Sequence, residues 1–187
     1  MIINEKALVQ EMKQAYKGWG YTVIVRPGDK WVFKTDSWMV QIDGQGNVPN
    51  EVLALIVLHM GELPKKESVC RIYKVDTGPA IQKEVFAVAN EAIVKLEKMV
   101  EEADAQEPIQ RTKLMFGTYR VWQKEKDMEI FLMDPHDTRL IDSSEIVAVG
   151  EGVYAEGDIS WAFALRRMDA AEKVHIDHLA EIQWVEK

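Results

Sequence analysis

Histidine and aspartate side chains gather at two places in the sequence, where together they could bind a metal ion. The stretch "DPHD" spans residues 134–137 and brings His136 and Asp137 together. The stretch "HIDHLAEIQW" begins at His175 and adds His178. Imidazoles and carboxylates are the usual ligands of catalytic zinc and manganese, and such sites keep one position open for water. This set of residues therefore predicts a metal-dependent hydrolase as one alternative.

The local pattern around the histidines favours a structural role instead. A loop that begins with Asp-Pro between two strands is typical of a tight turn, in which aspartates bond to their own backbone and stay solvated. In the second stretch the apolar residues begin after Asp177, so its carboxylate is placed to cap the amides of a last helix. A capping carboxylate is not free to bind a metal. We therefore expect neither a metal ion nor another cofactor.

The triplet Asp76-Thr77-Gly78 matches the active-site sequence of aspartic proteases. That chemistry needs two copies whose carboxylates share a proton, and the sequence contains one. A helix that begins at Pro79, with Thr77 or Gly78 as its cap, explains the triplet better. The sequence also lacks a Walker loop, a dinucleotide fingerprint and a nucleophile elbow. These patterns favour a protein that is not an enzyme.

The composition restricts the compartment and the class of partner. The chain carries a formal net charge of −8, and most of the acidic excess lies in residues 107–187. An acidic surface repels phosphate backbones, which disfavours nucleic acid as a partner. The single Cys70 can form no internal disulfide, no apolar run is long enough to cross a bilayer, and the N-terminus lacks an export signal. We expect a cytoplasmic protein with no membrane contact.

Residues 1–76 are predicted to form an α-β-β-β-α module. Apolar residues at helical spacing predict the first helix over residues 4–17. The strands "YTVIVR" and "KWVFKT" flank "PGD", in which Pro27 and Gly28 suit the two central positions of a type II turn. "SWMVQI" adds a third strand, and the next helix, running to about Gly61, has apolar residues on most of its surface. Such a helix is expected to be nearly engulfed.

This element order is also that of double-stranded RNA binding domains, which leaves an RNA or DNA accessory factor as a second alternative. In such domains lysines at the start of the last helix contact phosphates across a groove. Here that helix is expected to be capped by Asn47, and its start presents Glu51 and no lysine. The residues therefore do not support the function that the order of elements suggests.

Residues 77–106 are predicted to form a long connecting helix, and residues 107–187 an acidic β-rich module. Apolar residues recur at intervals of three and four over residues 80–104, and polar "ADAQEPIQRT" marks the boundary after them. Short strands separated by turn signals follow, as in an antiparallel meander or small barrel, with a short terminal helix over residues 177–184. The expected strands are "TYRVWQKE", "MEIFLMD", "TRLID", "EIVAVG", "GVYAEG" and "ISWAFALRRM".

Two longer stretches carry a resemblance to known sequences. "INEKALVQEMKQAYKGWGYTVIV" and "VPNEVLALIVLHMGELP", together with the ending "IQWV", resemble segments of uncharacterised proteins from prophages and mobile elements of Gram-positive anaerobes. The resemblance implies a small bacterial or phage accessory protein in the cytoplasm. It includes no catalytic motif and assigns no site residue.

Taken together, these features predict an α+β protein with a non-enzymatic interaction or regulatory role. A protein partner, or a second copy of the chain, is expected to bind through the helix over residues 80–104 or through exposed strand edges. The metal-dependent hydrolase and the nucleic-acid accessory factor remain the alternatives.

Overall fold

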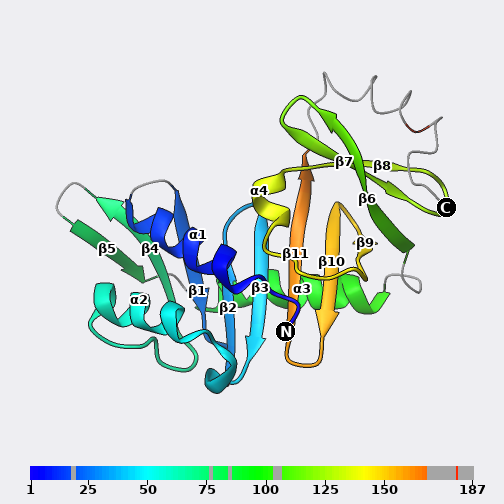
Figure 1. The fold of residues 1–187 in the computed structure, drawn as a ribbon. Helices are drawn as coiled ribbons and strands as arrows, with labels where there is room; N and C mark the ends of the chain where they lie inside the picture. The colour runs from blue at the N-terminus through cyan, green and yellow to red at the C-terminus, as the bar shows by residue number, and fades with distance from the viewer. Residues whose placement is uncertain (18–19, 76–77, 84–85, 103–106, 168–179, 181–187) are drawn as a thin grey trace.

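The computed structural model describes residues 1–17, 20–75, 78–83, 86–102, 107–167 and 180. Within these residues the chain forms an α+β fold whose strands all pair antiparallel (Figure 1). The predicted α+β class is thus confirmed. No helix in this part of the chain has the length and apolar character needed to cross a bilayer.

The first half of the chain follows the predicted order of a helix, three strands and a helix, and two further strands come after it. Its elements are α1 (Glu5–Lys17), β1 (Tyr21–Val25), β2 (Lys30–Lys34), β3 (Trp38–Asp43), the 3-10 turn η1 (Gln45–Asn47), α2 (Asn50–Met60), β4 (Val69–Val75) and β5 (Gly78–Lys83).

The turn after β1 lies one residue, and the N-cap of α2 two residues, from its predicted position. Gly28 has the expected positive φ of 60°, but the closing hydrogen bond runs from the Lys30 amide to the Pro27 carbonyl at 3.1 Å. Pro27 is therefore the first residue of this turn and not the second. Likewise Pro49, not Asn47, is the N-cap residue of α2.

The predicted helix over residues 80–104 is wrong in its first part. Helix α3 begins at Phe86 and ends at Glu102, and residues 78–83 form strand β5 instead. The backbone of β5 pairs with β4, from Val75 opposite Gly78 to Cys70 opposite Lys83. This pairing satisfies one edge of β4, whose other edge is occupied by β1.

The second half of the chain is rich in strands, as predicted. Its elements are β6 (Glu107–Phe116), β7 (Tyr119–Lys124), β8 (Ile130–Met133), α4 (Pro135–Thr138), β9 (Val147–Val149), β10 (Gly152–Gly157) and β11 (Ser160–Arg167).

Two segments of this half differ from the predicted strands. Strand β6 was not predicted. It begins at Glu107, within the polar stretch "ADAQEPIQRT", and its proline lies near the end of the strand, where proline is tolerated. "TRLID" forms no strand and contributes the isolated bridge between Ile141 and Ile3. Apart from residue 180, the predicted terminal helix over residues 177–184 lies outside the described residues.

The strands form one sheet in the order β10-β9-β6-β7-β8-β11-β3-β2-β1-β4-β5. β11 also pairs with β10, so six strands of the second half close into a ring. One edge of β11 is shared, because Ser160–Ala164 pair with β3 while Arg166 and Arg167 pair with β8. The β3–β11 pairing places the predicted first and third modules in a single sheet.

Helices cover both faces of this sheet (Figure 1). α1 and α2 pack on one face over a core that includes Leu8, Met12, Trp31 and Phe33. α3 packs on the other face, and its buried residues belong to a core drawn from strands of both halves of the chain. In the described chain α3 therefore lies against the sheet and does not link separate bodies.

Candidate functional site

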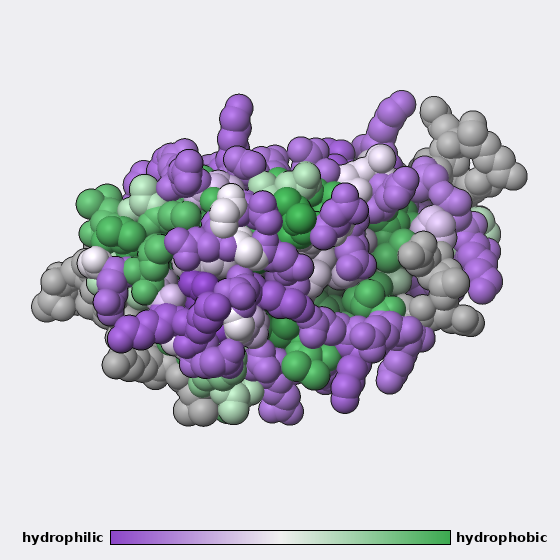
Figure 2. Space-filling view, turned by 90° about the horizontal axis from the view of Figure 1, so that it is seen from below, coloured by the Kyte–Doolittle hydropathy of each residue, from purple (hydrophilic) through white to green (hydrophobic). Residues whose placement is uncertain are grey.

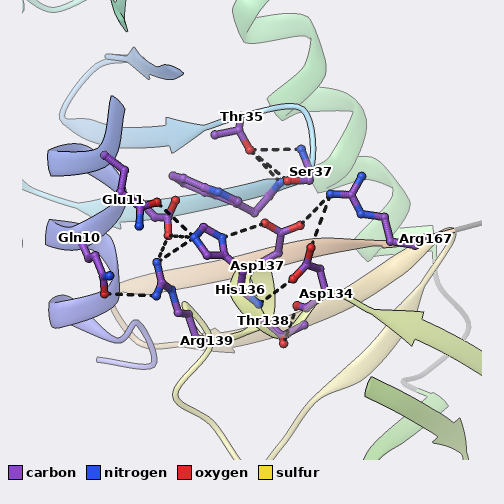
Figure 3. Close-up of polar contacts among 12 residues, drawn as sticks. Gln10, Glu11, Thr35, Ser37, Asp134, His136, Asp137, Thr138, Arg139 and Arg167 are labelled. Atoms are coloured by element: carbon purple, nitrogen blue, oxygen red, sulfur yellow. Dashed lines mark hydrogen bonds and ion pairs between the residues drawn. The ribbon is translucent and has the colours of Figure 1, made fainter. Parts of the chain in front are cut away.

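The predicted turn at residues 134–137 is a single helical turn, α4, that places the side chain of His136 beside α1 (Figure 3). Asp134 is its N-cap residue, because its Oδ1 accepts a hydrogen bond from the His136 amide at 2.8 Å. The Thr138 hydroxyl donates to the Asp134 carbonyl at 3.0 Å. The expectation that an aspartate here bonds to its own backbone is confirmed for Asp134.

The imidazole of His136 lies between two buried carboxylates (Figure 3). Its Nε2 is 3.2 Å from Glu11 Oε1, and its Nδ1 is 3.7 Å from Asp137 Oδ1. Glu11 is 7% exposed and Asp137 4% exposed. The expectation that Asp137 stays solvated is therefore wrong, because α4 turns this side chain towards the end of β11 and the loop before β3.

Two arginines neutralise these carboxylates. Arg139 Nη2 pairs with Glu11 Oε1. Arg167 Nη2, at the end of β11, lies 3.6 Å from Asp137 Oδ2 and 3.9 Å from Asp134 Oδ2. We refer to Glu11, His136, Asp137, Arg139 and Arg167 as the α4 cluster. The cluster ties α1, α4 and β11 together through charged groups.

Burial raises the pKa of Asp137, and this is the largest of several effects. A hydrogen bond with Ser37 lowers the pKa, the neighbouring Asp134 raises it, and Arg167 and His136 lower it. Asp137 Oδ2 has no hydrogen-bond partner among the described residues. The groups around the ionised carboxylate therefore do not fully replace the hydration that it loses on burial.

The α4 cluster does not present His136 as an open metal ligand. Its Nε2 is 3.0 Å from Arg139 Nη2 and 3.2 Å from Gln14 Oε1, and a guanidinium at that position repels a metal cation. No three histidine, cysteine, aspartate or glutamate side chains in the described ranges are placed to hold a metal ion. His175 and His178 lie outside those ranges, so the predicted four-residue metal site stays a prediction.

The residues that surround His136 were not predicted from the sequence. Glu11 and Arg139 are separated by 128 positions, and no local spacing indicates their contact. One signal was present: Glu11 lies next to Met12 on the buried side of α1, where a carboxylate needs a partner.

The single cysteine is not a candidate nucleophile. Cys70 is 4% exposed, and burial raises the pKa of its thiol to about 12. Its Sγ lies 3.8 Å from the Met60 sulfur. The thiol therefore stays protonated at neutral pH, where a thiolate would be needed for attack.

An uncovered apolar surface lies on α2. The helix was expected to be nearly engulfed, but Val52 and Ile56 are its buried residues, whereas Val57 is 42% exposed and Leu58 75% exposed. α2 packs against α1 and the sheet with one side, and the described chain does not cover the other. Figure 2 shows hydrophobic side chains gathered over this end of the molecule, on the left of the view.

Two clefts adjoin the C-terminal half of α3. The larger, of about 780 Å³, lies against β6, β9 and β10 and includes Arg111 and Glu125 in its lining. The smaller, of about 400 Å³, lies against β2, β3, β10 and β11 and is lined by many acidic residues. Val100, Tyr154 and Glu156 contribute to both.

Comparisons with known proteins assign no family. No protein-family model and no curated protein matches the sequence. Two solved structures show a distant likeness: the DNA polymerase III subunit beta from Pseudomonas aeruginosa, with a TM-score of 0.35, and the DNA polymerase sliding clamp from the same organism with ligand, with 0.34. Each is 10% identical over 92% of this chain, which spans 66% of the other chain. Likeness at this level carries no assignment.

Proposed function

We propose that this protein is a non-enzymatic accessory protein, of phage or mobile-element origin, that binds another protein at the end of the molecule formed by α2 and β5. The observation that carries the proposal is the exposure of Leu58, at 75%, beside Val57 on the outer side of α2. Apolar side chains that stay exposed together on a folded chain are typical of interaction surfaces.

The outer side of α2 has the geometry of a helix that packs against a partner. Ala54, Val57 and Leu58 are exposed and stand at spacings of three and four residues, so they share one side. We call these three residues the α2 outer face. Burying a leucine side chain completely contributes about 1.5–3 kcal/mol, so this face can supply the apolar centre of an interface.

Strand β5 provides a second feature at the same end of the molecule (Figure 1). It is the terminal strand of the sheet, and among the described residues its backbone pairs with β4 alone. A free strand edge binds an extended segment of another chain through main-chain hydrogen bonds. We therefore expect the partner to add a strand to β5 and to place apolar side chains on the α2 outer face.

The proposal is tested with a pair of matched variants. Leu58→Glu places a charge on the α2 outer face, and Val88→Glu places the same charge at a 67% exposed position on α3, on the opposite face of the sheet. Both positions are exposed, so both variants are expected to keep the melting temperature of the native chain within about 2 °C.

The measurement begins with a photo-crosslinking residue at position 54, on the α2 outer face, to capture a protein in a cell extract. The captured protein, or a second copy of the chain, is then purified and titrated against the native chain and both variants by calorimetry. We expect Leu58→Glu to raise the Kd about tenfold or more, equivalent to about 1.4 kcal/mol, and Val88→Glu to leave it within about twofold. Equal Kd values for all three chains contradict the proposal.

A further inference from the structure

The smaller cleft beside α3 has an unusual concentration of negative charge. The described residues that line it include five carboxylates and one basic residue, Lys30. The Nζ atom of Lys30 forms an ion pair with Glu97 Oε1 at 3.1 Å. The carboxylates come from separate elements: Asp43 from β3, Glu97 and Glu101 from α3, Glu156 from β10, and Asp158 from the turn before β11. The lining therefore attracts a positively charged ligand.

A buried acceptor in the wall of the cleft lacks a donor. Gln41 is 3% exposed. Its Nε2 donates a hydrogen bond to Asp43 Oδ1 at 3.1 Å. Both residues line the cleft from the same side of β3. Its Oε1 has no hydrogen-bond partner in the described chain. Buried amide oxygens normally accept at least one hydrogen bond. An N–H donor from a ligand would satisfy this atom.

One wall of the cleft is apolar and aromatic. The rings of Tyr154 and Trp161 are 6.0 Å apart, and Leu96 and Val100 of α3 face the same space. Burial, followed by the charge of Glu156 and a hydrogen bond with it, raises the pKa of Tyr154. Its hydroxyl therefore stays protonated, and the wall combines aromatic surface with carboxylates, which suits ammonium groups joined by methylene chains.

The spacing of the carboxylates favours an extended cation over a metal ion. Among the residues that the structure describes, no three acidic side chains are close enough to share a metal ion. A point charge such as magnesium is therefore poorly matched to this cleft, because it needs several oxygens at about 2.0–2.1 Å. An extended cation with separated charges can reach carboxylates on several elements at once.

We propose that the cleft binds a linear polyamine, whose ammonium groups contact the carboxylates and Gln41 Oε1 while its methylene groups lie on the aromatic wall. The volume of about 400 Å³ is within the range of about 300–1,000 Å³ common for small-molecule sites. The inference is independent of protein binding at α2 and β5, which lie at another part of the molecule.

The test is a calorimetric titration of the full chain with spermidine, in about 150 mM sodium chloride to screen non-specific attraction. We expect saturable binding of one equivalent with a Kd of about 10–100 μM. The double variant Glu101→Gln/Glu156→Gln removes two lining carboxylates and should weaken binding about tenfold or more. The control, Glu91→Gln/Glu102→Gln, removes the same charge from exposed positions of α3 outside the lining and should change the Kd less than about twofold.

Two further titrations sharpen the test. Gln41→Met keeps the side-chain length and removes the unpaired acceptor, so it should weaken binding about fivefold in a chain that still melts cooperatively. Magnesium chloride at matched ionic strength should give no saturable heat. Absence of spermidine binding, equal weakening by the two double variants, or saturation by magnesium with the affinity of spermidine would each overturn the proposal.

Discussion

Asp137 is the residue of the α4 cluster whose ionisation the folded chain opposes. Its pKa is raised above the ordinary value of 3.8, chiefly by burial, so the folded state binds this proton more tightly than the unfolded state does. The free energy of unfolding therefore gains a contribution as pH falls from the raised pKa to 3.8, and loses it as pH rises through the same interval. At neutral pH the buried charge is a net cost to the fold.

Asp137→Asn is expected to raise the free energy of unfolding at pH 7, because the neutral amide avoids the cost of keeping a carboxylate charged in this buried position. The amide can still accept the hydrogen bond of Ser37 and carries no charge. Urea unfolding at pH 7 and near pH 4 measures the difference, which should shrink at the lower pH. Asp134→Asn is the control, because asparagine keeps the N-cap of α4 and should change stability by less than about 0.5 kcal/mol. A loss of stability in Asp137→Asn at pH 7 contradicts this account.

At the scale of single residues, the sequence predicted the parts of the site that are local. The cap at Asp134 follows from the Asp-Pro pattern and needs no knowledge of the fold. The contacts of His136 with Glu11, and of Asp137 with Arg167, depend on how α1, α4 and β11 meet. The spacing of residues in a single sequence does not predict such contacts, because they depend on how the chain between the residues folds.

At the scale of elements, periodicity predicted well where a segment had one favourable structure. α1, the three strands after it and α2 were all expected, since each has a clear apolar pattern and turn residues at its ends. Residues 78–83 were placed in a helix because apolar spacing alone cannot show that β4 has an edge to fill. β6 was missed because its proline was taken as a boundary signal, although proline is tolerated near strand ends.

The close approach of β10 and β11 gives a prediction at this scale. A Cβ atom added at Gly152 would lie 2.5 Å from the Ala164 carbonyl oxygen and 2.5 Å from the Phe163 ring, whereas at Gly46 it would meet nothing within 4 Å. Gly152→Ala is therefore expected to lower the free energy of unfolding by about 1–3 kcal/mol through overpacking.

Gly46→Ala provides the matched control and should change stability by less than about 0.5 kcal/mol. Denaturant unfolding of the two variants beside the native chain makes the comparison. Equal stabilities for both variants would show that β10 and β11 are not packed as closely as described.

At the scale of the whole molecule, the pairing of β3 with β11 decides how the chain unfolds. Five residue pairs, from Ser160 opposite Ile42 to Ala164 opposite Trp38, join the first and second halves of the chain. α3 adds a core that draws side chains from strands of both halves. We therefore expect one cooperative unit.

Native-state hydrogen exchange tests this cooperativity. The slowest amides of β2, in the first half, and of β7, in the second half, should report the same free energy of opening within about 0.5 kcal/mol. That value should also equal the global free energy of unfolding from denaturant titration. A difference of more than about 2 kcal/mol between the two strands would show that the halves unfold independently.

The order of strands also affects folding during synthesis. β11 is the last described strand of the chain, yet it is the strand of the six-stranded ring that pairs with β3. On a ribosome, where the N-terminal segment emerges first, the edge of β3 that pairs with β11 has no partner until residues 160–167 have been synthesised. Nascent chains, or chains truncated before β11, thus present a bare strand edge, which favours pairing with other chains, and the emergence of β11 removes this hazard.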